Sequence, residues 1–248
     1  MSMLVVANWK MYPQTLRAAK ELVSATKRSL GKLTGVKVVI VPPSVFLKEV
    51  GKGARSTKVA YGAQNAHFER VGAFTGEVSM GQVRDAGATY VLIGHSERRA
   101  MGESNEDTNK KLLAALEAGL KPILCVGEWE RDEDGEYLEG FSAQVRDGLA
   151  GVPKNKLKNV LIAYEPVWAI GGEQAPEPHV VHEMVLYIRK ILMEPFGKAA
   201  LTIPVLYGGS VNEDTARLML DEGEVQGLLV GHVSVDAKRF STLLKSLK

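Results

Sequence analysis

The sequence predicts an α/β protein built as a closed (β/α)8 barrel, in which eight parallel strands are surrounded by helices. Eight short apolar runs recur along the 248 residues, at about one in every 31 residues. Amphipathic stretches separate these runs, and a strand that returns parallel to its neighbour needs such a crossover. Eight units of this size match a closed barrel of roughly 250 residues. We therefore expect residues 1–248 to form a single barrel domain.

The expected strands are short and rich in Val, Ile and Leu, which is typical of strands buried on both faces. In chain order, we expect strands at residues 4–8, 36–41, 59–62, 90–94, 122–126, 160–164, 203–207 and 227–230.

Between the strands, apolar residues recur at the spacing of one helix face. The expected helices cover residues 16–30, 109–118 and 178–192, and a last helix passes through Phe240, Leu243, Leu244 and Leu247. An open, doubly wound sheet is the alternative, and it usually has a Gly-rich first turn. Here the first strand ends in Asn8-Trp9-Lys10, and the sequence contains no Walker A motif.

Composition excludes several classes of protein. The formal charge is +2, with 45% hydrophobic and 24% charged residues, which is average for a globular chain and unlike a disordered one. A nucleic-acid binder would show a basic excess, and no run approaches the roughly 20 apolar residues of a membrane span. The N-terminus lacks the pattern of a signal peptide, and the single cysteine, Cys125, lies in an apolar run. We therefore expect a cytoplasmic protein with a buried Cys125.

Two segments rich in charged residues are expected to be solvated loops. The first covers residues 128–136 and is acidic, and the second contains Lys154, Lys156 and Lys158. His179 and His182 lie three residues apart on an expected helix, but no third metal ligand accompanies them. We interpret that pair as a solvated helix face and expect neither a metal nor a cofactor.

Polar residues and glycines gather where the expected strands end, which is where barrels carry their chemistry. They are Asn8 and Lys10 after the first strand, His95, Ser96 and Glu97 after the fourth, Glu165 after the sixth, Gly208, Gly209 and Ser210 after the seventh, and Gly231 and His232 after the eighth. Each residue alone has an ordinary structural explanation. Their common position on one face of the barrel favours a functional one.

This set of residue types suits proton abstraction next to a carbonyl in a phosphorylated substrate. A carboxylate takes the carbon-bound proton, and an imidazole polarises the carbonyl oxygen. The two glycine turns supply backbone N–H groups of the kind that bind phosphate. His95 precedes an expected helical turn, whose N-terminus disfavours imidazolium and keeps the ring neutral.

Six longer motifs resemble the triosephosphate isomerase family in content and in order, over essentially the whole chain. They are Ala7-Asn8-Trp9-Lys10-Met11, Gly62-Ala63-Gln64-Asn65, Gly72-Ala73-Phe74-Thr75-Gly76-Glu77, Ile93-Gly94-His95-Ser96-Glu97-Arg98-Arg99, the segment from Ala163 through Glu165 to Gly171, and Tyr207-Gly208-Gly209-Ser210-Val211.

The resemblance implies interconversion of dihydroxyacetone phosphate and D-glyceraldehyde 3-phosphate, as in glycolysis and gluconeogenesis, through an enediolate. Glu165 would be the base and neutral His95 the electrophile, with Asn8 and Lys10 binding substrate and Glu97 ordering Lys10. Gly171, Ser210, Gly231 and His232 would hold the phosphate through their backbone amides. The closing lid would consist of Pro166, Val167, Trp168, Ala169, Ile170, Gly171, Gly172 and Glu173.

The resemblance also implies a homodimer, formed through the loop from Asn65 to Ser79. In the family, the residue that matches Thr75 approaches Asn8 and Lys10 of the other subunit. The implied interface residues are Gln64, Asn65, Phe74, Thr75, Gly76, Glu77 and Arg98.

The chain departs from the family pattern at two places. The lid is a few residues shorter and reads Gly171-Gly172-Glu173 where the family has Gly-Thr-Gly-Lys, and we expect Glu173 to face solvent. His232 replaces a glycine, which costs energy if that backbone needs a positive φ. Two alternative functions remain open. One is a non-catalytic phosphosugar-binding protein, and the other is a different phosphosugar isomerase or epimerase on the same barrel.

Overall fold

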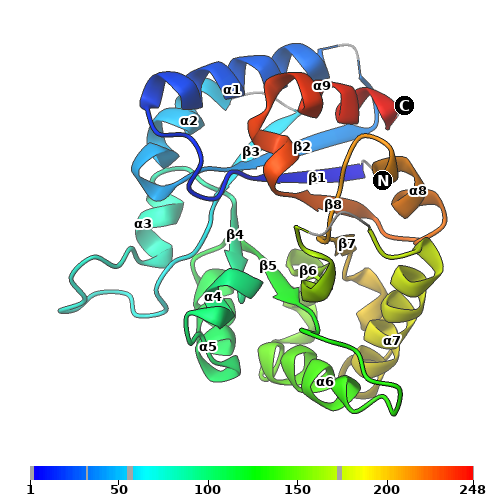
Figure 1. The fold of residues 1–248 in the computed structure, drawn as a ribbon. Coiled ribbons are helices and arrows are strands. Elements are labelled where there is room, and N and C mark those ends of the chain that lie inside the picture. The colour runs from blue at the N-terminus through cyan, green and yellow to red at the C-terminus, as the bar shows by residue number, and fades with distance from the viewer. Residues whose placement is uncertain (1–2, 32, 55–57, 172–174, 248) are drawn as a thin grey trace.

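The computed structural model describes residues 3–31, 33–54, 58–171 and 175–247, and it confirms the closed barrel. The strands follow one another around the barrel in chain order, all parallel, and β8 closes against β1 (Figure 1). The strands are β1 (Met3–Asn8), β2 (Val36–Val41), β3 (Val59–Ala63), β4 (Tyr90–Ile93), β5 (Lys121–Val126), β6 (Leu161–Tyr164), β7 (Val205–Tyr207) and β8 (Gly227–Val230).

The expected strand positions are confirmed, and the largest shift is at β7. Residue 203 was expected to begin this strand, but Ile203 instead ends a 3-10 helix, and Pro204 has no backbone N–H to donate to a ladder. The carbonyl of Pro204 still accepts a hydrogen bond from the Ile162 N–H at 3.0 Å, so β7 remains tied to β6.

Helices surround the barrel in the described residues. The α-helices are α1 (Leu16–Leu30), α2 (Leu47–Ala54), α3 (Met80–Asp85), α4 (Ser96–Ala100), α5 (Asn105–Glu117), α6 (Tyr137–Gly148), α7 (Pro178–Phe196), α8 (Thr215–Asp221) and α9 (Ala237–Ser246). Shorter 3-10 helices are η1 (Ser44–Phe46), η2 (Lys154–Asn159), η3 (Val167–Ala169), η4 (Gly197–Thr202) and η5 (His232–Val235).

Local sequence explains where these helices start. The Thr15 hydroxyl caps α1 by accepting a hydrogen bond from the Ala18 N–H at 3.1 Å. α5 begins at Asn105, four residues before the expected position, because Ser104 and Asp107 form a reciprocal capping box. That box is a start signal that apolar periodicity by itself did not reveal.

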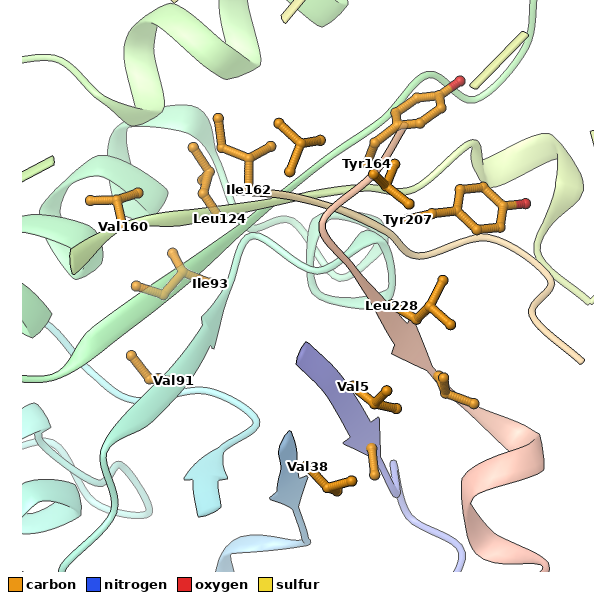
Figure 2. Close-up of a cluster of buried hydrophobic side chains, with 14 of the residues drawn as sticks. Val5, Val38, Val91, Ile93, Leu124, Val160, Ile162, Tyr164, Tyr207 and Leu228 are labelled. Carbon is orange, nitrogen blue, oxygen red and sulfur yellow. The ribbon is translucent and has the colours of Figure 1, made fainter. Parts of the chain in front are cut away.

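Alternate strand residues build two apolar layers. The larger cluster joins one face of each strand to the helices, and Figure 2 shows part of it, including Val5, Val38 and Leu228. The smaller cluster contains buried side chains from the strands alone, such as Val6 and Val39, so it fills the interior of the barrel. The barrel is therefore a packed core with two open mouths, at the two ends of its strands.

The loop between β3 and α3 projects away from the barrel (Figure 1). Its base is closed by a bridge between His67 and Ser79 and by a hydrogen bond from the His67 N–H to the Val78 carbonyl at 2.7 Å. Toward the tip, Val71 is 89% exposed and Phe74 is 43% exposed. Apolar side chains thus stand in solvent on an extended loop.

Candidate active site

A cavity of about 490 Å³ opens at the C-terminal ends of the strands. It brings together most of the residues that the sequence indicated at the strand ends. Those that line it are Asn8, Lys10, His95, Glu165, Gly208, Gly209, Ser210, Gly231 and His232, and two residues of the expected lid, Ile170 and Gly171, line it as well. Tyr12 and Arg239 also line it, and sequence reasoning missed both.

Lys10 follows β1 in an unusual backbone conformation, with φ at +47°. Such values are uncommon for residues other than glycine, so the surrounding contacts must hold the turn. The Lys10 N–H donates to Asn8 Oδ1 at 3.1 Å, and its carbonyl accepts from Gln64 Nε2 at 2.8 Å. Lys10 Nζ lies 2.7 Å from Glu97 Oε1. This ion pair between Lys10 and Glu97 supports the prediction that Glu97 orders Lys10.

His95 is the N-cap residue of α4 and is buried. Its Nδ1 accepts a hydrogen bond from the Glu97 N–H at 3.2 Å, so Nδ1 carries no proton in this arrangement. The ring proton then resides on Nε2, which lies 3.2 Å from Glu165 Oε1 and 3.3 Å from Asn8 Nδ2. The ring is then a neutral imidazole, and His95 lines the cavity together with Asn8 and Glu165.

Glu165 is 2% exposed, directly after β6. Its Oε2 accepts a hydrogen bond from the Ser96 N–H at 3.0 Å, which stabilises a buried carboxylate. Its Oε1 has no well-directed hydrogen bond in the described part of the chain. A carboxylate oxygen that has no well-directed hydrogen bond, in a pocket, is suited to accept a proton.

Two glycines make room for Glu165. A Cβ atom on Gly127 would lie 1.7 Å from the Glu165 carbonyl oxygen, and one on Gly208 would lie 2.9 Å from Glu165 Cγ. Real Cβ atoms do not approach backbone that closely, so any side chain at Gly127 would displace the base.

Cys125 lies under the site and is fully buried, as predicted. Burial raises the pKa of its thiol, and the nearby Glu165 carboxylate raises it further. The protonated thiol is then a small apolar filler rather than a nucleophile.

Arg99 braces the turn that carries His95. Its Nε donates to the Gly94 carbonyl at 2.8 Å, and its Nη1 donates to Asn105 Oδ1 at 2.7 Å. The guanidinium thus joins the end of β4 to the start of α5.

The acidic run after β5 is not wholly a solvated loop, and that expectation was wrong for Glu128. Glu128 is 3% exposed, and its Oε1 accepts three hydrogen bonds. The donors are Tyr164 Oη at 2.8 Å, Trp168 Nε1 at 2.9 Å and Arg131 Nε at 2.8 Å. The sequence signal that could have predicted its burial is its position two residues after a buried strand, at the same mouth of the barrel as the other site residues.

Glu128 therefore anchors the start of the segment that the sequence suggested as a lid. The Val167 N–H donates to the Glu128 carbonyl at 2.9 Å, and residues 167–169 form η3. Burial raises the pKa of Tyr164 well beyond its usual range, so the phenol keeps its proton and donates to Glu128.

The next part of the lid reaches the turn after β7. Ser210 Oγ donates to the Ala169 carbonyl at 2.6 Å, and Ile170 and Gly171 line the cavity. Gly171 has φ at +74°, a conformation that favours glycine. Gly172 and Glu173 lie outside the described residues, so the expected orientation of Glu173 stays a prediction.

His232 needs no strained backbone. Among the described residues, only Lys10 and Glu224 have a positive φ without being glycine. His232 instead begins η5, and its ring meets the Tyr12 ring edge-on at 5.3 Å between centroids. A Cβ on the preceding Gly231 would lie 3.3 Å from Lys10 Cε, so the Lys10 ammonium arm borders this turn.

The residues that the resemblance assigned to an interface do not line the cavity. Thr75, Gly76 and Glu77 are exposed, as is Phe74. Three others are half-buried and already engaged: Gln64 with Lys10, Asn65 with Lys111, and Arg98 with Glu103.

Each of the two histidines of α7 lies near a carboxylate. His179 Nδ1 is 3.2 Å from Glu177 Oε2, and His182 Nδ1 is 3.6 Å from Glu224 Oε2.

No helix in the described residues has the length and apolarity needed to cross a bilayer.

Comparison with known proteins gives one consistent result. The family model described as triosephosphate isomerase matches residues 3–247. A curated triosephosphate isomerase from Roseiflexus sp. is 42% identical over 247 residues, covering 98% of this chain and 97% of the relative. Those from Carboxydothermus hydrogenoformans and Aquifex aeolicus are 41% and 39% identical, and they cover 97% and 99% of this chain. The alignments span 97% and 100% of those two relatives.

Proposed function

The chain belongs to the triosephosphate isomerase family, and we propose that Glu165 and His95 carry out the proton transfers of its reaction. The activity is an aldose–ketose isomerisation that interconverts dihydroxyacetone phosphate and D-glyceraldehyde 3-phosphate. The alternative of a phosphosugar binder, or of another isomerase, is not favoured by these relationships.

Glu165 takes the proton from the carbon next to the substrate carbonyl. The C–H electron pair then forms the C=C bond of an enediolate, and the carbonyl oxygen gains the negative charge. His95 Nε2–H donates a hydrogen bond to that oxygen and passes protons between the two oxygens. Glu165 returns its proton to the neighbouring carbon, which completes the isomerisation without a cofactor.

One observation carries this assignment: the Glu97 N–H donates to His95 Nδ1 at 3.2 Å, beside Glu165 at 3.2 Å from Nε2. A Glu base beside a neutral imidazole that acts as the electrophile is the established division of roles in triosephosphate isomerase. The geometry of this chain supports the same division of roles.

The remaining site residues bind and enclose the substrate. Lys10 supplies positive charge next to the turn at Gly231, where backbone amides are available to a phosphate. The contacts of Glu128 with Trp168 and of Ser210 with Ala169 anchor the expected lid, and Ile170 and Gly171 line the cavity. A covered site keeps water from a reactive enediolate phosphate.

The experiment is isomerase turnover of D-glyceraldehyde 3-phosphate in deuterium oxide, with Glu165→Gln in parallel. We expect solvent deuterium on carbon in the wild-type product. We expect kcat to fall by at least about 10²–10⁴-fold in Glu165→Gln, the range for a positioned base. The exposed Glu130→Gln is the matched control. Unchanged turnover in Glu165→Gln would refute the assignment.

We infer that two copies of the chain form a homodimer around the loop from Asn65 to Ser79. Exposed apolar side chains follow four consecutive strands, so they belong to one side of the catalytic mouth. They are Met11 at 84%, Val45 at 79%, Val71 at 89%, Phe74 at 43% and Met101 at 76% exposed. Large exposed apolar patches are typical of protein interfaces.

We also infer a cytoplasmic location, which suits a chain whose single cysteine, Cys125, stays a free thiol.

A further inference from the structure

The barrel has a second cavity, at the mouth opposite to the active site. Its volume is about 420 Å³, which is within the usual range for small-molecule sites. The strand residues that line it come from the N-terminal ends of β1, β2, β4, β5 and β6, and α8 covers one side. These lining residues include Leu4, Lys37, Tyr90, Lys121, Lys158, Leu161, Arg217, Leu220 and Asp221.

Two of its lysines occupy strand positions that face the interior of the barrel. Lys37 pairs with Leu4, and Lys121 pairs with Tyr90, and both of those partners belong to the interior cluster. Paired residues on neighbouring strands point to the same face of a sheet. Lys37 and Lys121 therefore occupy interior-facing positions at this mouth, where a barrel normally carries apolar side chains.

The cavity has an excess of three positive charges. Arg217 Nε is paired with Asp221 Oδ2 at 2.6 Å. Within the residues that the structure describes, Lys37, Lys121 and Lys158 have no carboxylate or carbonyl partner. Lys121 Nζ instead lies 5.8 Å from the centroid of the Tyr90 ring. Like charges that share one mouth and lack counter-charges create a field that attracts anions.

Tyr90 adds a hydrogen-bond donor to this cavity. The residue is 6% exposed and lines the cavity, and its hydroxyl has no hydrogen-bond partner among the described protein groups. Burial raises the pKa of Tyr90, so the phenol stays protonated and keeps its O–H available. A donor at the wall of a cavity can serve a bound anion.

We propose that this mouth of the barrel binds an organic polyphosphate, with its phosphates among Lys37, Lys121 and Lys158. The Tyr90 hydroxyl donates to the same anion, and the apolar body of the ligand packs on Leu4, Leu161 and Leu220. Several compact ammonium groups suit a multiply charged phosphate chain, and the apolar surface favours an organic phosphate over an inorganic one. The site is separate from the catalytic mouth and does not depend on the isomerase assignment.

The test is calorimetric titration with ATP in magnesium-free buffer, with the active site saturated by a phosphorylated enediolate mimic. We expect saturable binding at one site per chain that weakens as salt is added, because screening shortens the reach of surface charges. Inorganic tripolyphosphate is titrated in parallel, and we expect it to bind more weakly because it lacks an apolar body.

The variants separate this cavity from general surface charge. Lys121 and Lys158 are exposed, so Lys121→Gln with Lys158→Gln should fold normally, and we expect ATP to bind at least about tenfold more weakly. Lys154→Gln with Lys156→Gln is the matched control, since both lysines are exposed on η2 but do not line the cavity. Tyr90→Phe should weaken binding about two- to tenfold through loss of one hydrogen bond.

Three results would overturn the proposal. One is no saturable heat while the active site is occupied. A second is equal weakening by the two lysine pairs, which would mean diffuse attraction to the surface. A third is tripolyphosphate binding as tightly as ATP, which would show that apolar contacts with the ligand contribute nothing to binding. The isomerase rate of the Lys121 and Lys158 variants should equal that of the wild type, so a failure here is distinguishable from a failure of the isomerase assignment.

Discussion

The Glu128→Gln substitution tests how the lid is attached to the barrel. Glu128 Oε1 accepts hydrogen bonds from Tyr164, Trp168 and Arg131 at 2.8–2.9 Å, and its Oε2 is buried without a partner in the described residues. Glutamine keeps the shape and one acceptor oxygen. It removes the negative charge and places an amide NH2 where the second oxygen lies.

The expected loss of stability follows from those contacts. Hydrogen bonds to a charged acceptor are about twice as strong as neutral ones, and a buried donor without a partner costs about 1–3 kcal/mol. The contribution from Arg131 is smaller because its side chain is 24% exposed. We expect the free energy of unfolding to fall by about 2–4 kcal/mol, which is roughly 5–15 °C in Tm for a chain of this size.

Activity should fall with stability, because Trp168 belongs to the segment that we expect to act as a lid. If the substitution destabilises the state with the lid closed over the substrate by about 1.4 kcal/mol, kcat/KM drops roughly tenfold. Thermal unfolding by circular dichroism and steady-state kinetics measure the two effects. Glu130→Gln is the matched control, since Glu130 is exposed in the same loop. A Glu128→Gln variant that matches Glu130→Gln in both Tm and kcat/KM would refute the anchoring role.

Three further predictions address the phosphate site, the dimer and a helix cap. His232→Gly should leave the Kd of a phosphorylated enediolate mimic within about fivefold at pH 7, because the backbone N–H survives the change. A loss greater than tenfold would mean that the imidazole itself binds phosphate. Phe74→Glu should convert a dimer to a monomer in sedimentation velocity, whereas Leu186→Glu, at a 54% exposed residue of α7, should not. A wild-type monomer would contradict this. The hydrogen bond from the Ser104 hydroxyl lowers the pKa of Asp107, so its stabilising effect is present above about pH 4 and is lost as the pH falls through the lower folded-state value. Asp107→Ala should therefore cost about 0.5 kcal/mol in urea unfolding at pH 7 and less at pH 2, and a difference independent of pH would contradict the cap.

Apolar patterning predicted the strands well because each barrel strand is buried on both faces and therefore carries a continuous apolar run. The starts of β7 and of α5 were harder to place. Pro204 and the capping box at Ser104 act through individual backbone hydrogen bonds, which an average over apolar residues does not register.

Strand-end positions predicted the catalytic mouth, because all parallel strands of a barrel end on the same side. The same rule applied to Glu128, yet the acidic residues that follow it made the segment look like a surface loop. Only its three donors, which come from β6, the lid and its own loop, explain why this carboxylate is buried. Tyr12 and Arg239 were missed because they lie beyond the strand ends.

The sequence by itself determined the number and order of the strands, the face that carries Lys10, His95 and Glu165, and the kind of reaction those side chains support. These follow from local patterns and from the geometry of parallel strands. The tertiary structure decided which side chains come together: His95 Nε2 beside Glu165, Glu128 with its donors Tyr164 and Trp168, and the lysines gathered at the opposite mouth. Such contacts join residues far apart in the chain, at angles and distances that only the closed barrel fixes.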